Sequence, residues 1–250
     1  MNFLTLGDPG NKTVLFFHAM GVTGESSLPV ARYLEKDHFI ILPTLSAYCP
    51  GETMISKEDE TEQLIRWLEE HGISEIRLLV ASSLGADFAM TFLSRWTGKV
   101  YKAFFDGGQF AHIGAMTRKI MIPFLYLTIK SLYWSNGRTL KQILWCDDEE
   151  IKPYFIQAGK NLDYASMKAM MRDCLTKEPF INLPQDFQKN CIFEFGNLEE
   201  HFKYRDSVMK AYPYARFPVF EDMNHMQLQI RDPKGFAQML KNFIDETGDK

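Results

Sequence analysis

The sequence lacks an excess of positive charge and has no long basic run. Its 28 lysines and arginines are outnumbered by 32 aspartates and glutamates, which gives a formal net charge of −4. Because surfaces that bind nucleic acids are built from clustered basic residues, this balance argues against a nucleic acid as a partner. Of the 250 residues, 46% are hydrophobic, which is enough to form the core of one globular domain.

Long hydrophobic runs are also missing. The most apolar stretch, residues 120–129, is followed at once by Lys130. A membrane-spanning helix needs about 20 apolar residues, so stable membrane insertion is not expected. The opening residues, MNFLTLGDPG, lack the basic start and the sustained apolar stretch of a secretion signal. We therefore expect a cytoplasmic location.

Cysteine and histidine are too scarce and too dispersed to indicate a metal site. No two cysteines form a CxxC pair, and no two histidines have HxxxH or HExxH spacing. We expect reduced, mostly buried thiols, and we predict neither a metal nor an organic cofactor. The four cysteines are Cys49, Cys146, Cys174 and Cys191.

Both ends of the chain alternate short apolar runs with helical patterns. The strands expected from these runs are 13–17, 39–42, 76–81, 100–105, 191–195 and 216–220. The expected helices are 28–35, 57–71, 83–96, 200–212 and 233–244. Strands that alternate with helices predict an α/β fold, with a parallel sheet covered by helices on both faces.

The middle of the chain has a different pattern. Residues 109–187 show no clear strand and several helical patterns rich in methionine and aromatic residues. We predict a helical cap at 109–187, inserted between two strands of a core formed by 1–108 and 188–250. Such side chains make adaptable apolar walls for a small-molecule pocket. Four basic residues of the cap are candidates either for contact with an anionic substrate or for a solvated helix face: Arg118, Lys119, Arg138 and Lys141.

A pair of serines lies between an apolar run and a helical pattern, in the segment VASSLGADF that begins at Val80. Ser83 has a small residue two positions away on each side, Ala81 and Gly85, whereas Ser82 has bulky neighbours at those positions. This is the spacing of the nucleophile elbow G-x-S-x-G, in which a serine sits on a tight turn between strand and helix. The competing explanation is a serine that caps the helix N-terminus.

Two further segments carry candidate partners for Ser83. The segment Phe17-His18-Ala19-Met20-Gly21 follows the first strong strand, and the amides of Met20 and Leu84 are candidate donors to an oxyanion. His18 is expected to tie this loop down. His225 stands in a polar loop after the last expected strand, where a general base could reach the serine.

The order of oxyanion loop, elbow serine, helical insertion and C-terminal histidine resembles the α/β-hydrolase superfamily over nearly the full length. The resemblance implies a mostly parallel, eight-stranded sheet flanked by helices, with the active site at the carboxyl ends of the strands. Two positions depart from the family pattern. The oxyanion loop reads His-Ala instead of His-Gly, and the elbow begins with alanine instead of glycine. Both changes exchange one small residue for another.

The same resemblance suggests where the acid of a catalytic triad stands. Family members usually carry it after the strand expected at 191–195, and Glu199 falls on that position. A shift of one residue would select Glu200. A subset of the family places the acid after the preceding strand, where Asp106 stands. Glu199 is the preferred acid, and Asp106 and Glu200 are the alternatives.

These residues predict a serine hydrolase that cleaves a small, largely apolar ester through an acyl-enzyme, as carboxylesterases do. Thioesterase, lysophospholipase and C–C hydrolase activities would use the same residues, since fold and triad alone do not separate them. An alternative of another class is a catalytically silent, hydrolase-like protein that binds a ligand. The sequence indicates neither the physiological substrate nor the oligomeric state.

Overall fold

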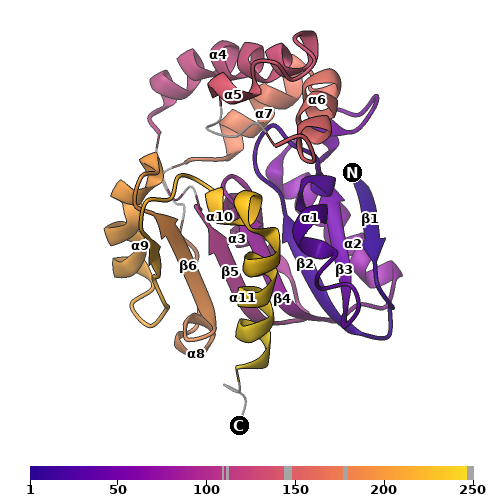
Figure 1. The fold of residues 1–250 in the computed structure, drawn as a ribbon, viewed down its shortest axis with the longest axis vertical. Helices are drawn as coiled ribbons and strands as arrows, with labels where there is room; N and C mark the ends of the chain where they lie inside the picture. Colours follow the sequence, from indigo (N-terminus) through magenta and orange to yellow (C-terminus); the bar gives the residue numbers. More distant parts are fainter. Residues whose placement is uncertain (109, 111–112, 144–147, 177–179, 247–250) are drawn as a thin grey trace.

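A single sheet of seven strands runs through the centre of the described chain, with the order β1-β3-β2-β4-β5-β6-β7 (Figure 1). The computed structural model describes residues 1–108, 110, 113–143, 148–176 and 180–246. Only the pairing of β1 with β3 is antiparallel, and the other neighbouring strands are parallel. The strands are β1 (Asn2–Leu6), β2 (Lys12–Phe17), β3 (His38–Thr44), β4 (Glu75–Ser82), β5 (Lys99–Asp106), β6 (Cys191–Gly196) and β7 (Val219–Phe220).

Helices cover both faces of the sheet, so the central strands are apolar on both sides. In β2, Val14 and Phe16 belong to one buried cluster, while Leu15 and Phe17 belong to the other. This alternation follows from the two-residue period of a strand. The first cluster includes residues of α1 (Leu28–Ala31) and α11 (Pro233–Asp245), and the second includes residues of α2 (Lys57–Glu70), α3 (Gly85–Arg95) and α9 (Arg205–Ala211).

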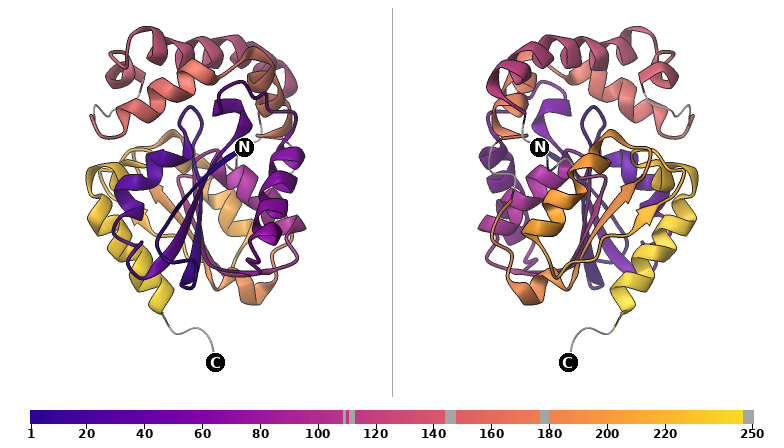
Figure 2. Two further views of the ribbon diagram at one scale, coloured as in Figure 1. Left: turned by 90° about the vertical axis from the view of Figure 1, so that its right-hand side faces the viewer. Right: turned by 90° about the vertical axis from the view of Figure 1, so that its left-hand side faces the viewer.

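The segment between β5 and β6 is helical wherever it has regular structure in the described residues. Its helices are α4 (Ala115–Trp134), α5 (Leu140–Ile143), α6 (Lys152–Asn161), α7 (Tyr164–Asp173) and α8 (Gln185–Gln188). Helix α4 packs on α6 and α7, and these helices form a layer beyond one end of the sheet (Figure 2). The division of the chain into a core and a cap domain stays a prediction.

The remaining helical turns are short and lie in loops. They are η1 (Gly24–Ser27), η2 (Ser46–Tyr48), η3 (Glu200–Tyr204) and α10 (Gln227–Arg231). The single helix expected at 200–212 is therefore divided into η3 and α9.

The predicted class, a mostly parallel sheet flanked by helices, is confirmed, but the predicted number of eight strands is wrong for the described residues. Strand β1 was not expected, because it lies at the edge of the sheet and none of its residues is buried. The strand expected at 216–220 is reduced to β7 and an isolated bridge between Ile192 and Arg216. Pro218, which separates the two, has no amide hydrogen for the ladder.

Cys49, Cys174 and Cys191 are free and buried, and Cys146 lies outside the described residues. Within the described ranges, no helix combines the length and hydrophobicity needed to cross a membrane.

Candidate active site

Ser83 stands on the turn between β4 and α3, and its backbone is left-handed, with φ at 53°. A residue other than glycine rarely adopts this conformation, because its Cβ crowds the backbone. Two hydrogen bonds hold the turn. The Ser83 amide donates to the carbonyl of Asp106 at 2.9 Å, and the Ser83 carbonyl accepts from the amide of Ala86 at 3.0 Å. This is the strained geometry that the elbow spacing predicted for Ser83.

The first turn of α3 lies directly against the end of β2, which explains the glycine two residues after Ser83. A Cβ at Gly85 would lie 2.4 Å from the carbonyl oxygen of Phe17 and 2.8 Å from that of His18. Backbone oxygens cannot move away cheaply, so only glycine fits here. The close packing brings the start of α3 next to the loop that carries Met20.

His18 ties that loop to the end of β3. Its Nδ1 lies 2.8 Å from the carbonyl oxygen of Ala19, and its Nε2 lies 3.2 Å from the amide nitrogen of Leu45. Since Nε2 must accept from that amide, the Nδ1 atom carries the hydrogen and donates to Ala19. Burial lowers the pKa of His18 to about 4, so the ring is neutral near pH 7.

The amides of Met20 and Leu84, the predicted oxyanion donors, flank the turn at Ser83 from two different loops. In the described part of the chain, neither amide donates a hydrogen bond to another backbone group. Met20 and Ala19 both line the cavity that Ser83 faces. The two amides therefore stay candidate donors to an oxyanion.

His225 is bound to a buried carboxylate. Its Nδ1 lies 2.5 Å from Oε2 of Glu199, whose side chain is fully buried, whereas the His225 side chain is 24% exposed. Glu199 follows β6 and His225 follows β7, so two adjacent parallel strands deliver the pair to the same edge of the sheet. A carboxylate at Nδ1 fixes the orientation and the tautomer of the ring.

Neither of the two alternative acids, Glu200 and Asp106, makes this contact with Nδ1 of His225. Glu200 is exposed at the start of η3. Asp106 is buried, and its Oδ2 accepts a hydrogen bond from Nε2 of Gln229 at 2.6 Å. The observed contact to Nδ1 of His225 is made by Glu199.

Asp106 and Glu194, both buried, are register partners in the pairing of β5 with β6. Burial, together with the negative charge of Asp106, raises the pKa of Glu194 to about 11. Glu194 is therefore neutral near pH 7 and donates its hydrogen to Asp106. Burial also raises the pKa of Asp106.

Ser82 is hydrogen-bonded to Gln229, the same residue that binds Asp106. Its hydroxyl accepts a hydrogen bond from Nε2 of Gln229 at 3.0 Å, and the side chain is buried at the end of β4. The two adjacent serines thus have different surroundings, because Ser83 lines the cavity and Ser82 does not.

Two residues near His225 were missed by the sequence analysis. The ring of His201 lies edge-on to that of His225, with 5.0 Å between the centroids. Burial, with a smaller contribution from His225, lowers the pKa of His201 to about 4, so His201 is neutral near pH 7. No local pattern distinguishes this histidine in the sequence.

Gly107 is the second missed residue. Its φ is 58°, and a Cβ there would lie 2.6 Å from Nδ1 of His225 and 2.9 Å from Oε2 of Glu199. The Gly107-Gly108 pair directly after β5 was a signal for such a close approach.

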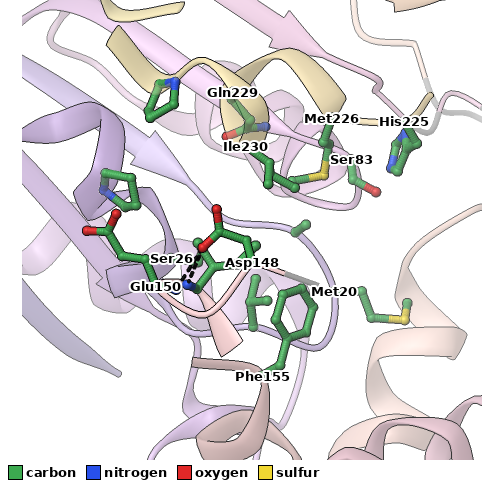
Figure 3. A pocket seen from close by; sticks show the side chains of 15 residues that line it. Met20, Ser26, Ser83, Asp148, Glu150, Phe155, His225, Met226, Gln229 and Ile230 are labelled. Atoms are coloured by element: carbon green, nitrogen blue, oxygen red, sulfur yellow. Dashed lines mark hydrogen bonds between the residues drawn. The ribbon is translucent and has the colours of Figure 1, made fainter. Parts of the chain in front are cut away.

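Ser83 and His225 line one cavity of about 220 Å³ (Figure 3). Its apolar walls come from several loops and helices and include Met20, Val22, Ile151, Phe155, Met226 and Ile230. Two carboxylates, Asp148 and Glu150, also line the cavity, and Glu150 pairs with Arg32 at 2.5 Å. None of the four basic residues proposed to meet an anionic substrate lines this cavity. The cavity therefore fits a small, largely apolar molecule.

Comparisons with known proteins identify the fold. No family model and no curated protein matches the chain, but many solved structures do. An alpha/beta hydrolase family protein from Desulfitobacterium hafniense has a TM-score of 0.75 at 17% identity, with 98% of this chain and 100% of that chain covered. The chain has the α/β-hydrolase fold.

Two esterases share this fold with the chain. A thermophilic esterase from Thermogutta terrifontis has a TM-score of 0.73 at 13% identity, and the match covers 97% of this chain and 92% of that one. A carboxylesterase from Bacillus subtilis has a TM-score of 0.68 at 15% identity, with 97% and 87% covered. At such low sequence identities, the similarity shows only that the fold is shared. The α/β-hydrolase fold brings Ser83, His225 and Glu199 to one end of the sheet, in the chain order of the resemblance.

Replacing Gly107 by alanine is expected to disturb the His225–Glu199 pair. Gly51 is a matched control, since it also has a positive φ, of 75°, but a Cβ there would meet nothing within 4 Å. Gly51→Ala should cost about 1 kcal/mol of unfolding free energy through backbone strain alone. Gly107→Ala should cost roughly 2 kcal/mol or more and shift the imidazole NMR signals of His225. Equal losses, with unchanged His225 signals, would contradict the close approach described for Gly107.

Glu194→Gln is expected to change how stability depends on pH. The pKa of Glu194 is about 11 in the folded protein against an ordinary value of 4.5, so above pH 5 the unfolded chain has lost a proton that the folded protein keeps. Because of this group, the free energy of unfolding of the wild-type protein falls as pH rises. Glutamine does not ionise, so the variant should gain stability relative to wild type with rising pH, as measured by urea unfolding. The exposed Glu149→Gln is the control, and a pH-independent difference for Glu194→Gln would refute the neutral state of Glu194.

Proposed function

We propose that this protein is a serine hydrolase that cleaves small, largely apolar carboxylic esters through an acyl-enzyme. One observation carries the proposal: the left-handed Ser83 faces the same cavity as a histidine whose Nδ1 is bound to a buried carboxylate. Serine hydroxyls are weak nucleophiles unless a base and an oxyanion site accompany them. The chain offers candidates for both.

In the proposed reaction, His225 takes the hydroxyl proton of Ser83 as Ser83 Oγ attacks the ester carbonyl. The amides of Met20 and Leu84 donate to the oxyanion, and such donors contribute about 3–4 kcal/mol each to stabilising the transition state. The imidazolium, held by Glu199, then protonates the departing alcohol. Water attacks the acyl-enzyme with His225 again as base, which releases the acid and restores Ser83.

The substrate class follows from the walls and size of the cavity. A volume of about 220 Å³ with mainly apolar lining fits a short acyl or aromatic ester. Structural neighbours described as esterases and a carboxylesterase support the same reaction class at low sequence identity. Thioesters and carbon–carbon bonds would be cleaved by the same residues, so a substrate panel has to include them.

Labelling with a fluorophosphonate probe tests the nucleophile. We expect an adduct on Ser83, located by peptide mass spectrometry, and hydrolysis of p-nitrophenyl acetate or butyrate. Ser83→Ala and His225→Ala should abolish both signals, whereas the adjacent Ser82→Ala should keep the Ser83 adduct, since Ser82 does not line the cavity. No adduct on folded wild-type protein, together with binding of the intact ester in the cavity, would replace the hydrolase with a ligand-binding protein.

A comparison of the two buried carboxylates tests the acid. Glu199→Gln presents an amide to Nδ1 of His225 and should lower kcat by about 10²–10⁴-fold with little change in KM. It should also change the pH profile of kcat/KM. Asp106→Asn, which leaves the contact between Glu199 and His225 intact, should lower kcat less. The reverse order of losses would assign the acid to Asp106.

A further inference from the structure

One side of α4 exposes large apolar side chains to solvent. The exposed fractions are 73% for Met116, 67% for Ile120, 69% for Phe124, 54% for Leu127 and 62% for Trp134. Their spacings of four, four, three and seven residues place them on one side of the helix. We call these five residues the outer stripe of α4.

The opposite side of α4 is already packed. Ile129 and Leu132 are buried, and Gly159 of α6 approaches so closely that a Cβ there would lie 2.5 Å from the carbonyl oxygen of Ile129. The helix is thus apolar on both sides, although the protein covers only one of them. A helix that is hydrophobic all round is normally buried, and a contiguous exposed apolar patch marks an interaction surface. The outer stripe therefore needs a partner outside the described fold.

The chain segment that carries the stripe has charges of one sign only. Residues 107–146 contain no aspartate or glutamate but five lysines and arginines, in a chain whose net charge is −4. Lys119 is exposed next to Ile120, and Arg138 and Lys141 are exposed just after the end of α4. The five basic residues are Arg118, Lys119, Lys130, Arg138 and Lys141. Two of them turn toward the packed side of α4, because Lys130 donates to the carbonyls of Lys160 and Leu162 and Arg118 to that of Arg172.

We propose that the outer stripe of α4 docks on the surface of an anionic phospholipid bilayer. The apolar side chains would enter the boundary between headgroups and acyl chains, while the exposed Lys119, Arg138 and Lys141 meet the lipid phosphates. Tyr133 and Trp134, both exposed at the end of α4, are the residue types that favour this boundary. Such a helix lies along the bilayer and does not cross it, which agrees with the finding that no helix among the described residues could span a membrane. In Figure 1, α4 lies at the outer end of the molecule, where a flat surface could reach it.

A second copy of the chain fits the same stripe less well. In a two-fold contact each copy presents the same patch, so the basic residues around one stripe would face those around the other. Like charges brought together across an interface are repelled, whereas an anionic bilayer offers the opposite sign. Charge complementarity therefore favours the lipid.

Co-sedimentation with vesicles tests the proposal. The wild-type protein should bind vesicles of phosphatidylcholine mixed with phosphatidylserine, bind pure phosphatidylcholine vesicles at least about tenfold more weakly, and lose binding at high salt. The double variant I120S/F124S should lose about tenfold or more of the binding to anionic vesicles. Emission from Trp134 should move to shorter wavelength on binding, and this change should be missing in Trp134→Phe.

A matched control separates the stripe from exposed apolar residues in general. Tyr214 is 50% exposed, and its amide contacts the side chain of Gln188 in α8, at the opposite end of the molecule from α4 (Figure 1). Tyr214→Ser should leave vesicle binding unchanged. All substituted side chains are exposed and outside the cavity, so thermal stability and ester hydrolysis in solution should stay at wild-type levels.

Two results would overturn the proposal. The first is no binding to anionic vesicles at low salt, or binding that I120S/F124S leaves intact. The second is a dimer in analytical ultracentrifugation that I120S/F124S dissociates, which would assign the stripe to a second copy of this chain. Because docking is measured without turnover, either result leaves the proposed hydrolase activity untouched.

Discussion

The left-handed backbone of Ser83 constrains everything built around it. Holding a residue other than glycine in this conformation costs about 1–3 kcal/mol, and the surrounding fold must supply that energy. The Ser83 amide is bound to the carbonyl of Asp106, so the turn continues the pairing of β4 with β5. The fit of Gly85 against the end of β2 then brings α3 next to the Met20 loop. If any one of these segments moved, the backbone of Ser83 could relax out of its left-handed conformation.

Three carboxyl groups near this turn can be buried together because not all of them carry a negative charge. Asp106, Glu194 and Glu199 all lie at the ends of β5 and β6 or just beyond, and all three are buried. The proton on Glu194 removes one negative charge, and His225 lies against Glu199. Isolated buried charges are expensive, so the protonation of Glu194 is part of what makes the arrangement stable.

The sequence revealed those parts of the site that are local along the chain. The elbow around Ser83 is a pattern of five consecutive residues, and the loop at His18 directly follows an apolar run. Glu199 was found only through resemblance to a family, because nothing in its own segment indicates a contact with a histidine 26 residues away. Glu194, His201 and Gln229 were not found at all, since their roles arise from pairings across strands and loops. The count of eight strands likewise came from the resemblance and not from a run of residues.

The histidine and the acid depend on the most weakly paired edge of the sheet. Strand β7 has only two residues, and Pro218 interrupts its ladder with β6. Edges with few backbone hydrogen bonds open before the centre of a sheet does. A local opening there can therefore displace His225 and Glu199 from the cavity that Ser83 lines, while β2, β4 and β5 stay folded. On heating, the arrangement of His225 and Glu199 would be lost reversibly at temperatures where the core is still intact.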